Sequence, residues 1–290
     1  MNKTAAVVVT YNRKEMLKSC IQRLKVQTVP VDIIVIDNAS TDGTGDLFTE
    51  KQGGVLYFNT GANLGGAGGF NLGMRKAAEL GYESVWVMDD DTMPEADALE
   101  KLIEADKKLE GNYGWLSSKV LWKDGTPCRM NIQKITKWKP LNDFAGQQKI
   151  QYASFVSLFL NISVLKEYGL PYKEFFIWGD DWEFTRRISK EKPGYFIPES
   201  TVYHFCRENK GADIVTADPE KLDRFRYLYR NDVVLYRQDG FDGFIYMALR
   251  LAKHSVDIIF KAKGKTKKLK LMIGSVIKGI GFKPAQEILR

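Results

Sequence analysis

The segment VWVMDDD (85–91) ends an apolar run with three aspartates, Asp89, Asp90 and Asp91. Neighbouring carboxylates repel each other by about 1 kcal/mol per pair at 4 Å in water, and more strongly where water is scarce. A divalent cation offsets this repulsion, and carboxylates bind Mg²⁺ or Mn²⁺ together with substrate phosphates. Asp89 and Asp91 are therefore candidate metal ligands. The same residues can equally cap a following helix, so the spacing alone leaves two interpretations open.

A second acidic group, Asp180, Asp181 and Glu183, stands among aromatic residues in FFIWGDDWEF (175–184). Partial desolvation by aromatic neighbours raises the pKa of a carboxyl group, which suits it to act as a general base. Acidic residues are also typical of the first turn of a helix, where the helix dipole stabilises negative charge. The two interpretations are compatible.

Three further stretches carry polar or glycine-rich patterns. In IDNASTDGT (36–44), Asp37 ends a predicted buried strand and can bond a base or ribose, although the stretch also has the composition of an Asx turn. The glycine-rich segment 59–73 can bring backbone amides to an anion, but it contains neither G-x-G-x-x-G nor GK[ST]. His204 becomes a candidate third ligand only if a metal is present, because a lone histidine is more often a packing residue.

The composition is that of an ordinary globular protein, with 44% hydrophobic and 27% charged residues in 290. Three scattered cysteines favour a reducing cytosol over a disulfide framework. Neither a secretory signal nor an apolar run of spanning length is expected. Residues 241–290 hold 11 Lys/Arg against 3 Asp/Glu, a net +8, so the rest of the chain carries −1. This distribution argues against a nucleic-acid-binding body and indicates a basic appendage.

Short apolar runs alternate with helical periodicity over the first hundred residues, which predicts βαβ units and a mostly parallel sheet. Ligands of such sheets lie beyond the carboxyl ends of the strands, so the polar residues that follow the strands should meet at one edge. Residues 111–151 are expected to be irregular, 152–170 a strand leading into a helix, 194–205 a strand pair or turn, and 221 onward helical. The expected strands lie within 5–12, 31–44, 54–60 and 84–90, and the helices within 13–28, 45–52, 68–81 and 98–109.

Taken in order, these motifs resemble the inverting, nucleotide-sugar-dependent glycosyltransferases of family 2. The resemblance covers about residues 4–210. It is strongest to the bacterial galactofuranosyltransferases, with the rhamnosyltransferases next. The matching elements are VVVTYNR (7–13), VIDNASTDGT (35–44), NLGGAGGFNLGM (63–74), MDDDTMP (88–94), WGDDWEF (178–184) and YHF (203–205).

The resemblance implies an α/β GT-A fold with a nucleotide-sugar half (1–97), an acceptor half (98–220) and a basic helical C-terminal region (221–290). It also implies a site residue by residue. The metal, Mn²⁺ or Mg²⁺, would be held by Asp89, Asp91 and His204, and the base would be Asp181. The uridine and its phosphates would meet Thr10, Tyr11, Asn12, Arg13 and Asp37. The remaining substrate contacts would be Asn63, Gly65, Gly66, Gly69, Asp90, Trp178, Asp180 and Glu183.

The implied reaction is transfer of galactofuranose from UDP-galactofuranose to a glycan or polyprenyl-linked glycan in cell-surface polysaccharide synthesis. The alternatives are a rhamnosyltransferase using dTDP-rhamnose, a non-catalytic nucleotide-sugar-binding protein and a nucleotidyltransferase. The basic tail predicts contact with an anionic membrane, and its alternative is a helical hairpin packed on the catalytic domain. We therefore expect a cytoplasmic protein, peripheral on the inner face of the cell membrane, with no nucleic-acid partner.

Overall fold

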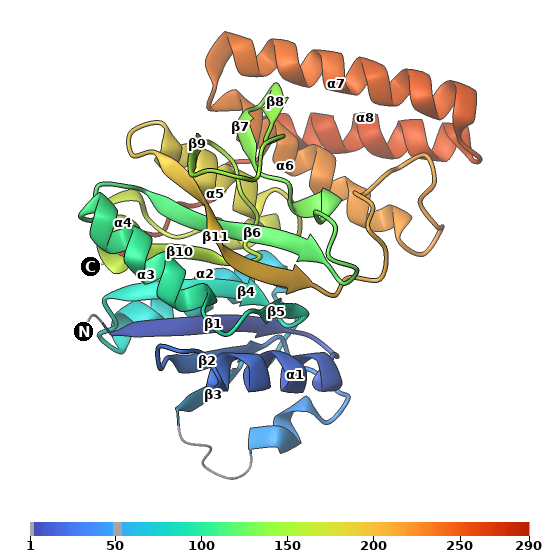
Figure 1. Cartoon of the computed structure of the whole chain (residues 1–290). Coiled ribbons are helices and arrows are strands. Elements are labelled where there is room, and N and C mark those ends of the chain that lie inside the picture. Colours follow the sequence, from blue (N-terminus) through green and yellow to red (C-terminus); the bar gives the residue numbers. More distant parts are fainter. Residues whose placement is uncertain (1–2, 49–53, 290) are drawn as a thin grey trace.

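Residues 3–48 and 54–289 are described by a computed structural model, and they form a mixed nine-stranded sheet with helices on both faces (Figure 1). The strand order is β3-β2-β1-β4-β10-β6-β11-β5, and β9 pairs with β11. The predicted α/β class with a mostly parallel sheet is confirmed.

The first half is a parallel sheet in which β1 lies between β2 and β4. Helix α1 packs on one face of it and α2 on the other, so that alternate strand residues enter two separate cores. The predicted helix at 45–52 is a short 3-10 turn at Thr44–Phe48, and its remainder lies outside the described residues. The elements are β1 (Thr4–Thr10), α1 (Lys14–Lys25), β2 (Asp32–Asp37), β3 (Val55–Asn59), α2 (Gly65–Glu79) and β4 (Ser84–Asp89).

The second half extends the same sheet. The expectation that 111–151 is irregular is wrong, because β6 is a strand paired on both sides, with β10 and β11. Residues 194–204 form one long strand, β11, whose register shifts between Ile197 and Thr201. The elements are β5 (Thr92–Pro94), α3 (Ala98–Leu109), β6 (Trp115–Trp122), β7 (Lys134–Thr136), β8 (Lys139–Pro140), β9 (Gln148–Ile150), β10 (Leu158–Asn161), α4 (Ile162–Tyr168), α5 (Asp180–Ser189) and β11 (Gly194–His204).

The C-terminal region forms the predicted helices α6 (Phe225–Arg237), α7 (Gly240–Lys261) and α8 (Lys265–Gly281). Helices α7 and α8 form a hairpin, and α7 is the outermost layer in Figure 1. Close approach of α8 to α6 needs Gly279, where a Cβ would lie 2.7 Å from the carbonyl oxygen of Arg230. The hairpin is therefore packed on the rest of the protein. Within the described residues, no helix is long and apolar enough to cross a bilayer.

Candidate active site

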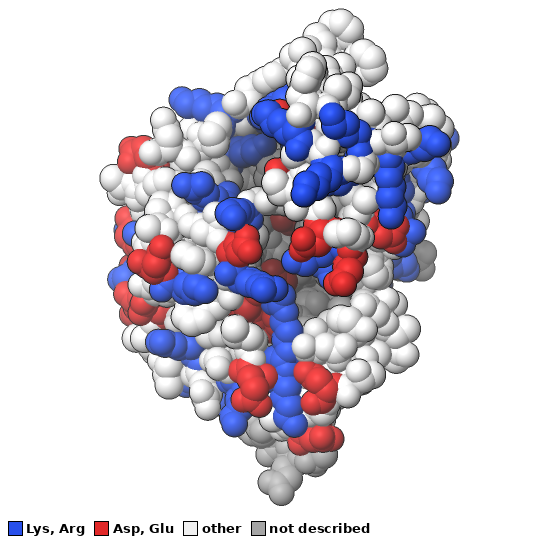
Figure 2. Space-filling model, turned by 90° about the vertical axis from the view of Figure 1, so that its right-hand side faces the viewer, with Lys and Arg blue, Asp and Glu red and all other residues white. Residues whose placement is uncertain are grey.

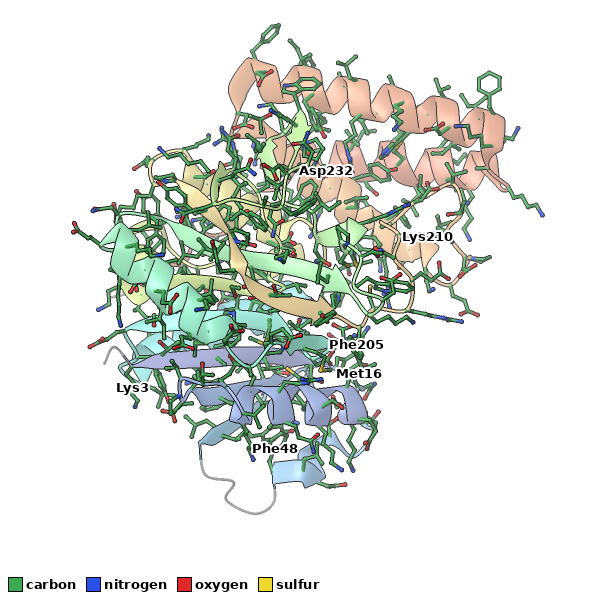
Figure 3. All side chains as sticks on the ribbon, viewed as in Figure 1. Lys3, Met16, Phe48, Phe205, Lys210 and Asp232 are labelled. Atoms are coloured by element: carbon green, nitrogen blue, oxygen red, sulfur yellow. The ribbon has the colours of Figure 1, made fainter. Side chains whose placement is uncertain are left out.

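The three aspartates lie where the chain leaves β4 and enters β5. Strand β5 pairs with β11 so that Thr92 stands opposite His204, and the amide of Phe205 donates to the Asp91 carbonyl at 2.8 Å. The aspartates and the histidine are thereby brought together from segments over 100 residues apart in sequence. Figure 3 shows Phe205 and Met16 of α1 at this end of the sheet and Lys3 at the opposite end.

Asp89, Asp91 and His204 each offer one ligand atom, and the three atoms lie within 4.8 Å of one another. The Oδ1 atom of Asp91 is buried and has no hydrogen-bond partner, although His204 Nε2 lies 3.1 Å away. Burial raises the pKa of Asp89 to about 7, and the neighbouring Asp91 carboxylate adds to the rise. Two carboxylates and one imidazole are ligands that suit Mn²⁺ or Mg²⁺, so the residues fit a divalent cation.

Asn131 orients the histidine, and the sequence analysis missed it. Its Oδ1 lies 2.8 Å from Nδ1 of His204, while its Nδ2 donates to Ser154 Oγ at 2.9 Å. The amide oxygen is thus the acceptor, so Nδ1 of the ring carries a proton, and Nε2 is the ring atom that faces the aspartates, 3.1 Å from Asp91 Oδ1. A histidine that ligates a metal is typically held in this way through its other nitrogen.

Arg13 and Thr10 reach the same cluster from the end of β1. The guanidinium of Arg13 donates to Asp90 at 3.2 Å and to Asp91 at 2.5 Å, and Thr10 Oγ1 donates to Asp90 at 2.7 Å. Burial raises the pKa of Asp90 to about 6, although Arg13 opposes the rise. The Arg13 side chain is 52% exposed, so it remains accessible to a phosphate. Figure 2 views this side, where acidic and basic side chains surround a hollow.

The loops after β1 and β2 are tied together. Asn12 adopts a left-handed conformation (φ 53°) and accepts the amide of Thr41 at 2.7 Å, and the neighbouring Tyr11 is exposed. Asp37 is fully buried, and its carboxylate accepts Ser40 N at 2.9 Å and Tyr57 OH at 2.7 Å. The carboxylate thus supports the loop, and the expected contact of Asp37 with a base or ribose stays a prediction.

The predicted glycines divide into two groups. A Cβ on Gly65 (φ +71°) would lie 2.0 Å from the carbonyl oxygen of Phe176, and one on Gly69 would lie 2.5 Å from Val9. These two glycines allow close packing, and Gly65 brings the start of α2 against the segment that precedes Asp180. Asn63 supports the turn by accepting the Gly65 amide at 2.9 Å. A Cβ on Gly66 would meet nothing within 4 Å, so this glycine faces open space.

Asp180 and Asp181 begin α5, as the dipole argument predicts. Asp180 is buried, and burial raises its pKa to about 7, whereas Asp181 is partly exposed and accepts the amide of Trp182 at 2.7 Å. Burial, the charge of Asp180 and then that of Asp89 raise the pKa of Asp181 well above its ordinary value. Asp181 therefore lies within the electrostatic reach of the cluster of Asp89, Asp91 and His204.

Glu183 is a buried carboxylate that pairs with an arginine of its own helix. It is 3% exposed, and Arg187 bonds both of its oxygens, at 2.9 and 3.2 Å. This ion pair holds the carboxylate against its own helix, and the expected contact of Glu183 with an acceptor stays a prediction.

Asn231 is a second residue that the sequence analysis missed. It is fully buried in α6, and its Nδ2 donates to the carbonyls of Phe175, Ile177 and Trp178 at 3.0, 3.2 and 2.8 Å. Trp178 has a positive φ of 65° and stacks edge-on against Phe225 at 5.2 Å. A single amide therefore fixes the loop that presents Trp178 and the following aspartates.

Comparison with known proteins agrees with this geometry. The family model described as "Glycosyl transferase family 2" matches residues 5–169. The chain belongs to this family. The predicted resemblance is confirmed, and the protein is a glycosyltransferase of the hexosyltransferase kind.

Among the proteins of similar sequence are two galactofuranosyltransferases. The chain is 40% identical over 254 residues to the galactofuranosyltransferase GlfT1 of Mycolicibacterium smegmatis, covering 81% of this chain and 83% of that protein. It is 33% identical over 260 residues to GlfT1 of Mycobacterium tuberculosis, with 81% and 82% covered. A shorter match, 35% identical over 104 residues, is to an undecaprenyl-phosphate mannosyltransferase of Micrococcus luteus, with 34% of this chain and 42% of that protein covered.

Solved structures share the fold at low sequence identity. GalNAc-T7, crystallised with UDP, GalNAc and Mn²⁺, superposes with a TM-score of 0.64 at 13% identity, covering 94% of this chain and 55% of that one. S. aureus TarS superposes with a TM-score of 0.59 at 14% identity, covering 97% of this chain and 44% of that one. At these identities the similarity establishes the GT-A-like fold alone.

Proposed function

We propose that this protein transfers galactofuranose from UDP-galactofuranose to an acceptor hydroxyl, with inversion at the anomeric carbon. The observation that carries the proposal is the cluster of Asp89, Asp91 and His204, whose ligand atoms lie within 4.8 Å of one another, and the partly exposed Asp181 at the start of α5 would supply the base. A base facing a diphosphate-binding cluster is the arrangement that direct displacement requires. The GlfT1 relatives support galactofuranose as the sugar.

In this mechanism Asp89, Asp91 and His204 would hold Mn²⁺ or Mg²⁺, which when bound stabilises negative charge on the leaving nucleoside diphosphate. Arg13 contributes a second positive charge beside the phosphates. Asp181 accepts the proton of the acceptor hydroxyl as that oxygen bonds to the anomeric carbon and the bond to the diphosphate breaks. Residues 1–97 would serve the donor and 98–220 the acceptor.

The donor prediction is tested by measuring turnover with UDP-galactofuranose, UDP-galactopyranose, UDP-glucose and dTDP-rhamnose, each with Mn²⁺ and with EDTA. We expect kcat/KM to be highest for UDP-galactofuranose and transfer to stop in EDTA. Preferred turnover of dTDP-rhamnose would establish the rhamnosyltransferase alternative. Binding without turnover of any donor would establish the non-catalytic one.

We also propose that the α7–α8 hairpin holds the enzyme on an anionic membrane, where a polyprenyl-linked glycan acceptor would be found. Helix α7 exposes large apolar side chains, including Phe241 (79%), Phe244 (68%) and Phe260 (77%). Exposed lysines flank them at 253, 261, 263, 265, 267 and 270. An apolar helix face bordered by lysines suits the membrane interface, where each lysine near an anionic leaflet contributes about 1 kcal/mol.

We expect the double variant Phe244→Ser/Phe260→Ser to lose salt-sensitive binding to vesicles containing phosphatidylglycerol, while transfer to a soluble acceptor is retained. Vesicle flotation measures binding to the membrane, and initial rates measure transfer to the soluble acceptor. The matched control is Val26→Ser/Leu80→Ser. These two exposed apolar residues (61% and 43%) cap the C-terminal ends of α1 and α2 and do not belong to the hairpin. If the two double variants bound the vesicles equally well, the proposed membrane contact of the hairpin would be contradicted.

A further inference from the structure

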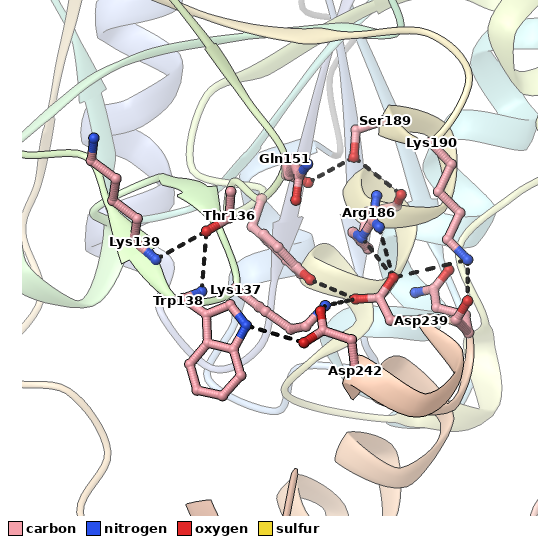
Figure 4. Close-up of polar contacts among 12 residues, drawn as sticks. Thr136, Lys137, Trp138, Lys139, Gln151, Arg186, Ser189, Lys190, Asp239 and Asp242 are labelled. Atoms are coloured by element: carbon pink, nitrogen blue, oxygen red, sulfur yellow. Dashed lines mark hydrogen bonds and ion pairs between the residues drawn. The ribbon is translucent and has the colours of Figure 1, made fainter. Parts of the chain in front are cut away.

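A cluster of charged side chains at the start of α7 is satisfied within the protein. Asp239 precedes this helix, and its two carboxylate oxygens pair with Lys137 at 2.9 Å and with Arg186 at 2.7 Å (Figure 4). Both oxygens are therefore already used, and this cluster fastens the helix to the body of the protein.

A second cluster, of sulfur and nitrogen atoms, lies beside the proposed reaction centre. Cys128, after β6, and Cys206, two residues beyond His204, each offer a sulfur, and these two atoms and a ring nitrogen of His204 lie within 4.8 Å of one another. The sulfur of Cys128 lies 3.7 Å from Nδ1 of the ring. The other ring nitrogen, Nε2, faces Asp91 at 3.1 Å. His204 therefore has a carboxylate beside one nitrogen and a thiol beside the other.

The two cysteine segments are fastened to each other by hydrogen bonds. Asn209, in the loop after β11, donates to the carbonyl of Pro127 at 3.1 Å. Trp122, at the end of β6, donates from its indole nitrogen to the carbonyl of Cys206 at 3.0 Å. These bonds fix the backbone of both segments, so the two sulfurs are already gathered around the imidazole.

The spacing of these atoms suits a zinc ion. Zn–S bonds are about 2.3 Å and Zn–N bonds about 2.1 Å in tetrahedral sites, so a sulfur and a nitrogen bound to one ion lie about 3.6 Å apart. The 3.7 Å between Cys128 Sγ and His204 Nδ1 is close to this value. Thiolates select Zn²⁺ and softer cations, whereas carboxylates suit Mg²⁺ and Mn²⁺. The two sides of His204 therefore favour different metals.

The thiol side is accessible from the surface. Cys206 is half-buried. A surface cavity of about 730 Å³ is lined by Pro127 and Arg129, which flank Cys128, and by Arg207, which follows Cys206. Three protein ligands leave the fourth position of a tetrahedral ion open, and water from this cavity can take it.

The imidazole can serve only one of the two sides at a time. A neutral histidine has a single ring nitrogen with a free lone pair. Asn131 Oδ1, 2.8 Å from Nδ1, leaves Nε2 for a cation held by the aspartates. A cation on Nδ1 would break the bond to Asn131 and leave the ring proton on Nε2, which would then donate to Asp91. The two cations therefore exclude each other at His204.

We propose that Cys128, Cys206 and His204 form a second metal site, selective for Zn²⁺, whose occupation inhibits transfer by withdrawing His204 from the catalytic cation. Zn²⁺ forms two bonds to sulfur and one to Nδ1. The two thiol protons leave to solvent, the ring keeps one proton on Nε2, and no atom is oxidised or reduced. Binding of Zn²⁺ is independent of the proposed function, and only the inhibition rests on it.

Cd²⁺ is the probe for the site, because thiolate-bound Cd²⁺ absorbs in the ultraviolet through sulfur-to-metal charge transfer. We expect reduced full-length protein to develop this band with one equivalent of Cd²⁺ and to lose it when Zn²⁺ is added. Cys128→Ala and Cys206→Ala should each weaken Cd²⁺ binding at least about tenfold. Cys20→Ala is the matched control and should keep the band, because Cys20 is buried against Met88 in the core beneath α1.

Inhibition is measured as the loss of UDP affinity and of transfer rate in Mn²⁺ as Zn²⁺ is added, each relative to the same variant without Zn²⁺. We expect Cys206→Ala, whose folding is checked by its unfolding temperature, to need at least about ten times more Zn²⁺ than the wild type for the same loss. Cys20→Ala should behave as the wild type.

A missing charge-transfer band, or a band that neither Cys128→Ala nor Cys206→Ala weakens, would overturn the site. Equal inhibition of Cys206→Ala and the wild type by Zn²⁺ would overturn the exclusion at His204, since the ion would then act at the aspartates. A wrong donor assignment would abolish the transfer rate and leave the Cd²⁺ result intact, so the failures of the two proposals are distinguishable.

Discussion

Asp181→Asn should reduce turnover by about 10² to 10⁴, the range typical for loss of a general base, while UDP and Mn²⁺ still bind. The asparagine side chain keeps the shape of the carboxylate. Its oxygen can still accept the hydrogen bond that the backbone N–H of Trp182 donates to Asp181 at 2.7 Å. The protein should therefore fold normally and lose only the proton acceptor. Initial rates measured beside calorimetric UDP affinity separate the two effects.

Asp180→Asn is the matched control, because it makes the same chemical change one residue earlier on α5. Successive side chains on a helix point about 100° apart, and Asp180 is buried whereas Asp181 is partly exposed. We expect a smaller loss of rate for Asp180→Asn. Similar mild losses in both variants would mean that the pair only caps the helix, and with Glu183 bonded to Arg187 the base would have to lie elsewhere.

The pH dependence gives an independent check on the same pair. A base must be ionised to act, so activity falls as the pH drops through its pKa. Burial and the charge of Asp180 raise the pKa of Asp181. The acid limb of the pH profile, where activity falls, should therefore lie at a higher pH than the pKa range of an ordinary carboxylate. Removing the neighbouring charge in Asp180→Asn lowers that pKa, and the limb of kcat/KM should move to lower pH. An unmoved limb would mean that another group controls it.

Local sequence patterns predicted the strand ends well and the buried polar contacts poorly. The runs of β-branched residues in β1, β2 and β4 are strong local signals, and parallel pairing then brings their polar ends to one edge. Strand β6 was missed because Ser117 and Ser118 interrupt its apolar pattern. Both are buried, since Ser118 bonds Ser157 and Ser200 at 2.6 and 2.7 Å and Gln133 donates to Ser117 at 2.9 Å. Such partners are invisible to a local pattern.

Because local patterns do not reveal partners that are distant in sequence, only some of the site residues were predicted. The aspartates, Arg13 and the glycines belong to contiguous motifs, whereas Asn131 and Asn231 act through residues 73 and 53 to 56 positions away. An isolated asparagine carries no signal of such a contact. The motif also gives no sign that Asp37 and Glu183 are bonded to the protein at both carboxylate oxygens, and their expected substrate contacts stay predictions.

Asp91→Ala should abolish the metal dependence of nucleotide binding. Asp91 is the most connected member of the cluster, since Arg13 bonds one of its oxygens at 2.5 Å and His204 approaches the other at 3.1 Å. Its removal takes away a ligand and also the carboxylate that Arg13 and His204 both contact. We expect UDP affinity in Mn²⁺ to fall at least about 10- to 100-fold, the loss that even outer partners of a metal site produce.

Calorimetric titration of UDP in Mn²⁺ and in EDTA measures this directly. The wild type should bind far more tightly in Mn²⁺, whereas Asp91→Ala should bind equally weakly in both. Asp97→Asn is the control, because it removes a nearby negative charge at the start of α3 without touching the cluster, and it should retain the full metal response. If Asp91→Ala kept a wild-type response to Mn²⁺, the buried Oδ1 without a hydrogen-bond partner would need another explanation, and the three aspartates would serve the turn into β5 alone.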